Sequence, residues 1–359
     1  MLTQDLPYWV AWSRSPKIGP RRLALLRRAF PDMQSAWRAP LQQLKQIGFE
    51  DNLCLELNDH RLKTDVEKSW LDVQNNHLQV TTIESPDYPA LLKEIGDPPA
   101  ILFWRGDWSA FKFPSLAVVG SRQMTDYGRQ ALASIVPPLA RSGITIISGL
   151  AFGIDAASHK LTIDNGGRTI AVLASGHDQL YPSVNRYLSD QIASKGGLII
   201  SEHPPGTPPL KHHFPVRNRI IAGLAKATLV VEAAASSGAL ITAKLALEYN
   251  REVLAIPGNI FSPQSEGTNE LLRIGAVIVT KASDILSIYN VSEKPAVAFR
   301  TLDMQEQGII NSIKTDPKHS DEIARELNIP AGDLIAKLTI LELEGFIKEI
   351  DKQKFISLV

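Results

Sequence analysis

The feature that most constrains the fold is a plan repeated between Leu116 and Val279. Each unit begins with a short apolar, often β-branched run, continues through a loop rich in Gly, Ser and Ala, and ends in an amphipathic helical pattern. The runs do not alternate between apolar and polar residues, as is typical of parallel strands buried on both faces. Strands that alternate with helices predict βαβ units with right-handed crossovers. We therefore predict an α/β fold with a doubly wound, mainly parallel sheet.

The loops after these strands carry small residues and cations. In a parallel sheet the carboxyl ends of the strands share one edge, where backbone N–H groups at helix N-termini favour an anion. We call this edge, with its loops, the rim. Its candidate phosphate contacts are Gly120, Ser121, Arg122, Ser148, Gly149, Gly153, Asn185, Arg186, Asn218, Ser237, Gly238 and Lys244. Arg217 and Arg219 are either phosphate contacts or struts between loops, and the sequence leaves both interpretations open.

The sequence lacks the motifs of a dinucleotide-binding site, a catalytic site and a metal site. The first strand ends in Gly120-Ser-Arg rather than G-x-G-x-x-G, and no acidic residue closes a second strand, so a dinucleotide cofactor is not predicted. No nucleophile with an adjacent base and no metal-ligand set is evident, so we predict no catalytic residues, no metal and no cofactor. His203, His212 and His213 lie in a proline-rich loop that we interpret as a structured lid.

Composition places the chain in a broad class. Its 359 residues suffice for two or three domains, and the formal net charge is zero. A single cysteine excludes a disulfide framework and fits a reducing compartment. Neither a signal peptide nor an apolar run of membrane-spanning length is evident, so we expect no membrane span.

The flanks differ from the repeated segment. Residues 1–75 are predicted to be helical, with a basic run after Lys17-Ile-Gly-Pro that resembles helix-hairpin-helix and sterile-alpha-motif-like hairpins. That run is either a phosphate-binding face or a solvated face of a packing domain. Residues 76–290 form the predicted main domain, in which 79–83 and 101–104 add edge strands, and 291–300 are a predicted linker. Residues 301–359 have the helix and strand order of a winged helix, but its acidic third helix favours packing or protein contact over DNA.

Several long motifs occur in order and closely resemble the DNA-processing protein A family, also called Smf. They are Gly120-Ser-Arg with Tyr127-Gly128, Ser148-Gly-Leu-Ala-Phe-Gly-Ile-Asp, Tyr181-Pro182 with Asn185, Phe214-Pro-Val-Arg-Asn-Arg-Ile-Ile-Ala-Gly-Leu, Ser237-Gly-Ala-Leu-Ile-Thr-Ala and Ile256-Pro-Gly-Asn. The resemblance covers about residues 78–290. It implies an extended Rossmann-like domain, flanked by a sterile-alpha-motif-like domain and a winged helix.

The resemblance also implies a cytoplasmic location and a function. Such proteins act in bacterial natural transformation: they bind single-stranded DNA without cleaving it, protect it and load RecA recombinase onto it, displacing single-strand-binding protein. The family's arginine contact falls on Arg122. Members often have Lys after the Tyr-Pro proline, where this chain has Ser183, so we assign that contact to Arg186. The homodimer and RecA contacts fall on Asn269, Glu270, Leu271, Leu272 and Gly275.

Two enzymatic alternatives remain. Nucleotide hydrolases of the lysine-decarboxylase-like, cytokinin-activating group share this type of sheet, but use a Pro-Gly-Gly-x-Gly-Thr loop where this chain has Glu232-Ala-Ala-Ala-Ser-Ser-Gly. A nicotinamide-dependent oxidoreductase would need the dinucleotide signature. Assays of base release and of nucleotide binding separate both from a DNA-binding protein.

Overall fold

The computed structural model describes residues 2–293, 302–314, 316–344, 346–351 and 353–357. The chain divides into two compact units, residues 1–293 and 294–359. Most of the predicted linker, residues 294–300, lies outside the described residues.

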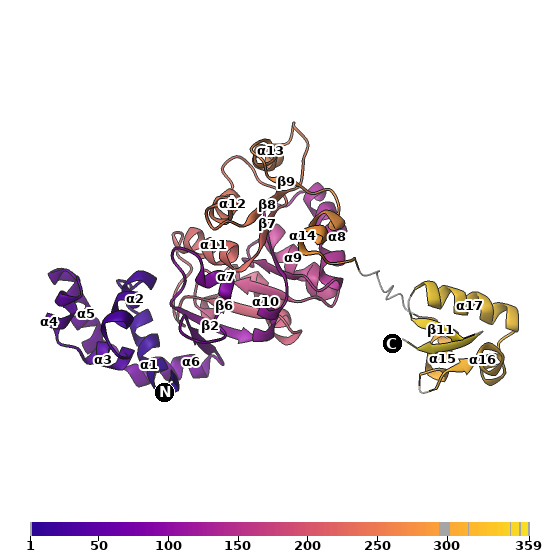
Figure 1. Ribbon diagram of the computed structural model, residues 1–359, viewed down its shortest axis with the longest axis horizontal. Coiled ribbons are helices and arrows are strands. Elements are labelled where there is room, and N and C mark those ends of the chain that lie inside the picture. Colours follow the sequence, from indigo (N-terminus) through magenta and orange to yellow (C-terminus); the bar gives the residue numbers. More distant parts are fainter. Residues whose placement is uncertain (1, 294–301, 315, 345, 352, 358–359) are drawn as a thin grey trace. The chain divides into compact units, whose positions relative to one another are not determined.

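One large sheet organises the first unit (Figure 1). Within residues 2–293, nine strands pair in the order β1-β2-β6-β5-β4-β3-β7-β8-β9. Strands β3 to β9 run parallel where they pair, while β1 and β2 are antiparallel additions at one end. The prediction of a doubly wound, mainly parallel sheet with added edge strands is confirmed. The strands are β1 (Gln79–Thr82), β2 (Ile101–Gly106), β3 (Ser115–Val119), β4 (Thr145–Ser148), β5 (Thr169–Val172), β6 (Leu198–Ser201), β7 (Ala227–Val230), β8 (Glu252–Ala255) and β9 (Val277–Ile278).

Helices cover both faces of the sheet because every central strand is apolar on both sides. Leu116 and Val118 of β3 pack with one set of helices, while Ala117 and Val119 pack with the other. The first face is covered by α8 (Asp126–Arg141), α9 (Ile154–Asp164), α10 (Arg186–Ser194) and α14 (Ala282–Tyr289). The second face is covered by α7 (Ala90–Lys93), α11 (His213–Leu224) and α12 (Gly238–Glu248).

A helical bundle precedes the sheet. Trp9 and Trp12 of its first helix are buried in one cluster with Ile101 and Phe103 of β2, so the bundle is packed onto the antiparallel end of the sheet. Its helices are α1 (Leu2–Ser13), α2 (Pro20–Ala29), α3 (Met33–Arg38), α4 (Leu41–Gln46), α5 (Asp51–Lys63) and α6 (Val66–Asn75).

The second unit is a winged helix with a core of its own. Ile309, Ile323, Leu338 and Phe355 come from four different elements and are buried together. The elements are α15 (Met304–Ser312), β10 (Lys318–His319), α16 (Ser320–Leu327), α17 (Ala331–Leu343), β11 (Ile347–Asp351) and β12 (Lys354–Ser357). Among the described residues of both units, no helix combines the length and apolar character needed to cross a membrane.

Candidate nucleic-acid interface

The strand order places a switch point at the carboxyl end of β3. The chain leaves β3 for β4, β5 and β6 on one side, then returns to β7 on the other side. In open α/β sheets, ligands bind at the carboxyl edge where the connections diverge in this way. Gly120, Ser121 and Arg122 follow β3 directly, so the predicted phosphate loop stands at this point.

The loop after β3 is held in place by hydrogen bonds to Glu232, which follows β7. The Ser121 N–H donates to the Glu232 carbonyl oxygen at 2.8 Å. The buried Glu232 carboxylate accepts hydrogen bonds from the Thr125 N–H at 3.0 Å and from the Thr125 hydroxyl. A Cβ at Gly120 would come within 2.7 Å of Ile154 Cγ1, so a larger residue would displace the loop. The backbone that carries Arg122 is therefore fixed in place.

The loop after β4 is held by two buried side chains of opposite charge, each of which bonds the Gly149 backbone. The Asp155 carboxylate accepts from the Gly149 N–H at 3.2 Å, and Arg217 donates to the Gly149 carbonyl oxygen at 2.7 Å and to the Val172 carbonyl oxygen. Burial raises the pKa of Asp155, while the Arg217 charge and hydrogen bonds act against that rise. Burial likewise lowers the pKa of Arg217 to about 10, so it stays charged at neutral pH.

Arg219, two residues further along α11, forms ion pairs of its own. It donates to Glu202 at 2.5 Å and has Asp97 at 3.7 Å, and its side chain is 7% exposed. Of the two interpretations of Arg217 and Arg219, this geometry is that of struts between loops. We call the buried side chains that brace the rim its inner layer: Ser148, Asp155, Asn185, Arg217, Arg219 and Glu232. Within it, Ser148 donates to the Val118 carbonyl oxygen at 2.6 Å, and Asn185 donates to that of Leu150 at 2.9 Å.

Other predicted site residues reach the surface. Arg122, Arg186 and Lys244 are exposed. Arg122 and Lys244 have no ion-pair partner among the described residues. Ser237 caps α12 by accepting from the Ala239 N–H at 3.3 Å, and Asn218 donates to the Gly238 carbonyl oxygen at 3.4 Å, which joins α11 to the start of α12.

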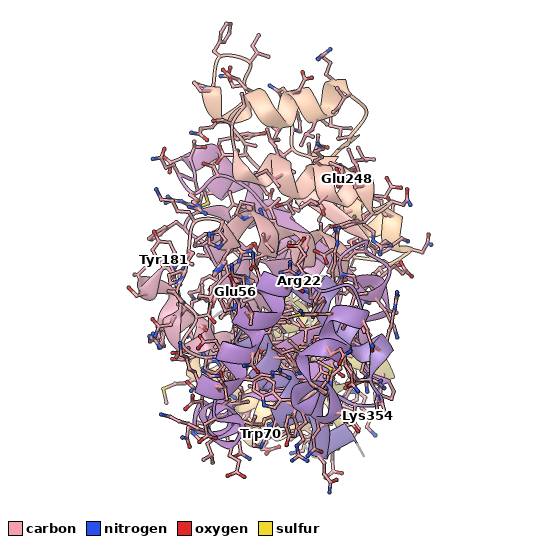
Figure 2. The ribbon with its side chains drawn as sticks, turned by 90° about the vertical axis from the view of Figure 1, so that its left-hand side faces the viewer. Arg22, Glu56, Trp70, Tyr181, Glu248 and Lys354 are labelled. Atoms are coloured by element: carbon pink, nitrogen blue, oxygen red, sulfur yellow. The ribbon has the colours of Figure 1, made fainter. Side chains whose placement is uncertain are left out.

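Sequence reasoning missed an aromatic cluster beside Arg122. The Arg122 guanidinium carbon lies 5.2 Å from the Phe214 ring centroid. Phe214 meets Tyr181 edge-on at 5.8 Å, and Tyr181 meets Phe152 at 6.4 Å. Phe152 is 44% exposed and Tyr181 is 48% exposed, and Figure 2 labels Tyr181 near the edge of the molecule.

The available signal was the presence of aromatic residues in segments already singled out for glycine or proline. Lys211, three residues before Phe214, is also exposed and was likewise not assigned a role. We call the surface groups of the rim its outer layer: the exposed Arg122, Phe152, Tyr181, Arg186, Lys211 and Lys244, and the partly buried Phe214.

His159, His203 and His213 pack against other side chains of the protein. His159 is fully buried in α9, its Nδ1 lies 2.6 Å from the Thr169 hydroxyl, and burial lowers its pKa to about 3. His203 and His213 stack with ring centroids 4.3 Å apart, and burial lowers the pKa of His203 to about 4. Within the described residues, no group of three or more His, Cys, Asp or Glu is arranged to hold a metal ion.

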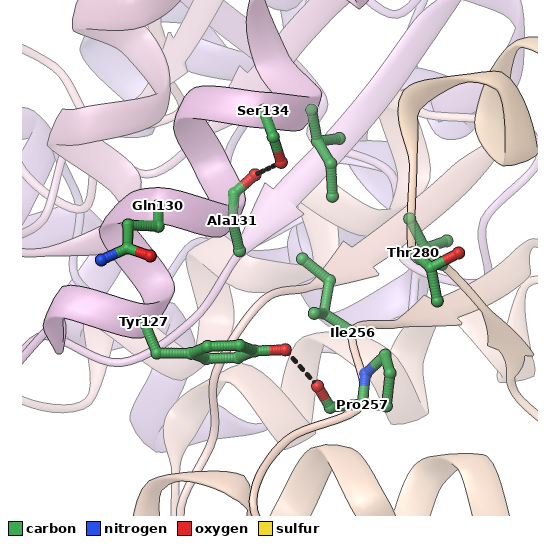
Figure 3. Close-up of a pocket in the computed structure, with 9 residues that line it drawn as sticks. Tyr127, Gln130, Ala131, Ser134, Ile256, Pro257 and Thr280 are labelled. Carbon is green, nitrogen blue, oxygen red and sulfur yellow. Dashed lines mark hydrogen bonds between the residues drawn. The ribbon is translucent and has the colours of Figure 1, made fainter.

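A shallow cavity of about 350 Å³ lies beside the rim, between α8 and the end of β8 (Figure 3). The Tyr127 hydroxyl donates to the Pro257 carbonyl oxygen across its floor. Its other lining residues include Gln130, Ser134 and Thr280. None of the predicted site residues lines this cavity, so the inner and outer layers form a site distinct from it.

The residues predicted to contact a partner lie on or just after α13 (Glu266–Arg273), and their exposure differs. Leu271 is 8% exposed within the main core, and Asn269 bonds the Gly258 backbone at 3.0 and 3.1 Å. Glu270 is exposed and pairs with Arg273; Leu272 is partly buried, and Gly275 is exposed. Unassigned apolar side chains are exposed nearby, at Ile274 and on the edge strand β9.

Comparison with known proteins places these features in a family. The family described as DNA recombination-mediator protein A matches residues 79–290, and the DprA winged helix domain matches residues 293–350. Protein Smf of Synechocystis sp. is 39% identical over 292 residues, which cover 80% of this chain and 73% of that protein. DNA processing protein DprA of Bacillus subtilis is 46% identical over 204 residues, covering 56% of this chain and 68% of that protein.

Two solved structures share the fold. DNA processing protein A of Streptococcus pneumoniae matches with a TM-score of 0.68 and 36% identity, covering 78% of this chain and 95% of that chain. DNA processing protein A of Helicobacter pylori, which has a single-stranded DNA binding mode, matches with a TM-score of 0.54 and 30% identity. That match covers 60% of this chain and 97% of the Helicobacter chain.

Proposed function

Because the chain belongs to the DNA recombination-mediator protein A family, we propose that it binds single-stranded DNA on the outer layer of the rim. The bound strand is protected there and handed to RecA recombinase during natural transformation, with single-strand-binding protein displaced. The observation that carries the proposal is the pairing of Arg122 with Phe214 at the switch point.

The outer layer has the two kinds of group that an unpaired strand engages. Arg122, Arg186, Lys211 and Lys244 are exposed cations, and an arginine fork matches a phosphate. Phe214, Tyr181 and Phe152 offer ring faces and edges to bases, which are accessible only when the strand is unpaired. Because stacking and phosphate contacts are available to every base, the binding is independent of sequence.

The inner layer supports binding without turnover. Two rim carboxylates, Asp155 and Glu232, accept hydrogen bonds from the backbone that they brace, and a third, Glu202, is paired with Arg219. A carboxylate with these partners positions loops and is not directed at a ligand, whereas hydrolysis of a nucleotide needs a group directed at the reacting bond. We therefore propose a non-enzymatic cytoplasmic mediator that uses no cofactor.

The homodimer and RecA contacts are proposed at α13 and the adjoining edge strand. Ile274 is 62% exposed and Ile278 is 56% exposed, and β9 ends the sheet with one edge unpaired in the described chain. An apolar surface next to an open strand edge is a ready site for pairing with a second chain. The buried Leu271 stabilises this surface from within.

The test is a binding titration with single- and double-stranded oligonucleotides of the same sequence. We expect preference for the single strand, and we expect Arg122→Ala to weaken single-strand binding several-fold at moderate salt. Unchanged affinity of Arg122→Ala, preference for duplex, or release of base from a nucleoside monophosphate would each overturn the proposal. Lys93→Ala, which removes an exposed lysine of α7, is the control and should bind like the wild type.

A further inference from the structure

The N-terminal bundle carries a second arginine-rich surface, outside the rim. Helix α2 contains four arginines and no acidic residue. Between Asp5 and Asp32 the chain has six Arg or Lys residues and no Asp or Glu. A formally neutral chain therefore concentrates positive charge on one short segment of its first unit.

The two sides of α2 use their arginines differently. On the inner side, Arg27 donates to the Glu84 carboxylate at 2.8 Å, and Leu23 and Leu26 are buried in the bundle. On the outer side, Arg21, Arg22 and Arg28 are exposed, and Leu25 between them is 42% exposed. Positions 21, 25 and 28 have the spacing of one helical stripe. We call this surface the α2 stripe: Arg21, Arg22, Leu25 and Arg28.

The charges of the α2 stripe are not neutralised by the protein. Among the described residues, Arg21 and Arg28 have no hydrogen-bond or ion-pair partner, and Arg22 donates only to the Lys17 carbonyl oxygen at 2.5 Å. Glu56, labelled with Arg22 in Figure 2, is engaged by Lys17 at 3.1 Å. Three guanidinium groups are thus available to an anionic partner.

The position of the stripe relative to the rim is set by packing. The Arg27–Glu84 pair joins α2 to the loop after β1, and the buried Trp9 and Trp12 pack against β2. The stripe and the rim therefore belong to one compact unit. A polyanion long enough to reach both would bind the second surface at high effective concentration.

We propose that the α2 stripe binds the sugar–phosphate backbone of a DNA segment adjoining the one held at the rim. This inference rests on the proposed function, which supplies the DNA. Arginine forks suit phosphates, and α2 carries no aromatic side chain for stacking, so the contact reads the backbone and not the bases. Leu25 alone offers too little apolar area for the core of a stable protein interface, which favours DNA over an acidic protein.

The test compares short and long single strands on the full chain. An oligonucleotide of about 8 nucleotides fills a rim-sized site, and one of about 40 reaches beyond it. The triple variant Arg21→Ala, Arg22→Ala, Arg28→Ala should bind the short strand like the wild type and the long strand about tenfold more weakly. Its salt dependence with the long strand should be shallower by about 2, because each phosphate contact on a single strand contributes about 0.7.

A matched control removes the same charge elsewhere. Lys68, Lys93 and Lys195 are exposed and lie on or next to three other helices. Their triple alanine variant should bind both strands like the wild type. Thermal unfolding of both triple variants should match the wild type, because the substituted side chains are exposed.

The outcomes separate the stripe from the rim. If the arginine triple variant binds the long strand like the wild type, or loses affinity equally for both strands, a separate segment on the stripe is excluded. If the arginine triple variant keeps full DNA affinity but loses binding to an acidic protein, DNA is not the partner of the α2 stripe. If Arg122→Ala leaves the short strand's affinity unchanged, the proposed rim function fails, whatever the stripe does.

Discussion

Arg217 and Arg122 lie at the same edge of the sheet, yet their guanidinium groups meet different surroundings. Arg217 is 4% exposed and donates to two backbone carbonyls near Asp155, whereas Arg122 is exposed over the Phe214 ring. The first belongs to the inner layer and holds loops together; the second belongs to the outer layer and is available to a ligand. A charge at a binding edge is therefore available to a ligand only where the protein leaves it unpaired.

The largest expected effect follows from removing the inner charge. Arg217→Met should lower the free energy of unfolding by about 3–5 kcal/mol, because it leaves the Gly149 and Val172 carbonyl oxygens without their donor and removes the charge that offsets the burial of Asp155. Urea denaturation measures this. Arg122→Met is the matched control and should change stability by less than about 0.5 kcal/mol, since its side chain is exposed. If the two variants lost similar amounts of unfolding free energy, Arg217 and Arg122 would not differ in structural role.

Low pH should test the surroundings of the inner layer through His159, a buried residue of α9. Burial, with a smaller contribution from the Arg217 charge, lowers the pKa of His159 to about 3, so the folded protein keeps this ring neutral where the unfolded chain protonates it. Stability from this group is therefore complete above about pH 6.5 and is lost as the pH falls, by about 2–3 kcal/mol at about pH 4.5. Denaturation midpoints across this range measure the loss.

The acid prediction has a matched pair of variants. His159→Asn should flatten the dependence of stability on pH, because it removes the buried titrating group. His77→Asn should leave that dependence unchanged, since His77 is exposed and its backbone φ of 53° suits asparagine. Parallel pH profiles for wild type and His159→Asn would show that the buried ring does not contribute.

The outer layer should respond through affinity and not through stability. Phe214→Leu should weaken single-strand binding by about 1 kcal/mol, or roughly fivefold, because one stacking surface is lost. Duplex affinity should not change, so the preference for single strands should shrink. Phe261→Leu is the control, since Phe261 is 88% exposed on the loop before α13. If Phe214→Leu kept the wild-type preference for single strands, the aromatic cluster would not be part of the binding site.

The two layers also mark how far sequence reasoning reaches. The parallel sheet was predictable because its strands are apolar without alternation, and the rim followed because small residues end those strands. The role of Arg217 and Arg219 could not be predicted. The motif places two arginines on α11, but it does not show which groups their side chains contact. Their surroundings depend on Asp155 at the start of α9 and on Glu202 after β6, which come from other parts of the chain.

The aromatic cluster was missed for a related reason. Phe152 and Tyr181 lie in two separate loops and Phe214 in the first turn of α11, and no local pattern brings them together. Only the parallel arrangement of β4, β5 and β6, whose carboxyl ends share the rim, makes them neighbours. Contacts of this kind depend on long-range topology, which spacing along the chain does not encode.

The smallest expected effect compares two lysines, one in each unit. Lys244 on α12 is exposed and unpaired in the described part of the chain, whereas Lys337 on α17 donates to Asp303 at 2.6 Å. Lys244→Ala should make the salt dependence of single-strand binding shallower by about 0.7, the contribution of one phosphate contact. Affinity titrations at several salt concentrations measure this slope.

Lys337→Ala should leave the slope unchanged, because that ammonium group is already satisfied by a carboxylate on its own winged helix. The neighbouring Asp333 and Glu342 on α17 would in any case repel a phosphate backbone. A winged helix reads DNA by inserting a helix whose cations face the groove, and α17 offers a single paired lysine instead. If Lys337→Ala changed the slope as much as Lys244→Ala, the winged helix would join the binding surface, and availability of charge would no longer distinguish the two units.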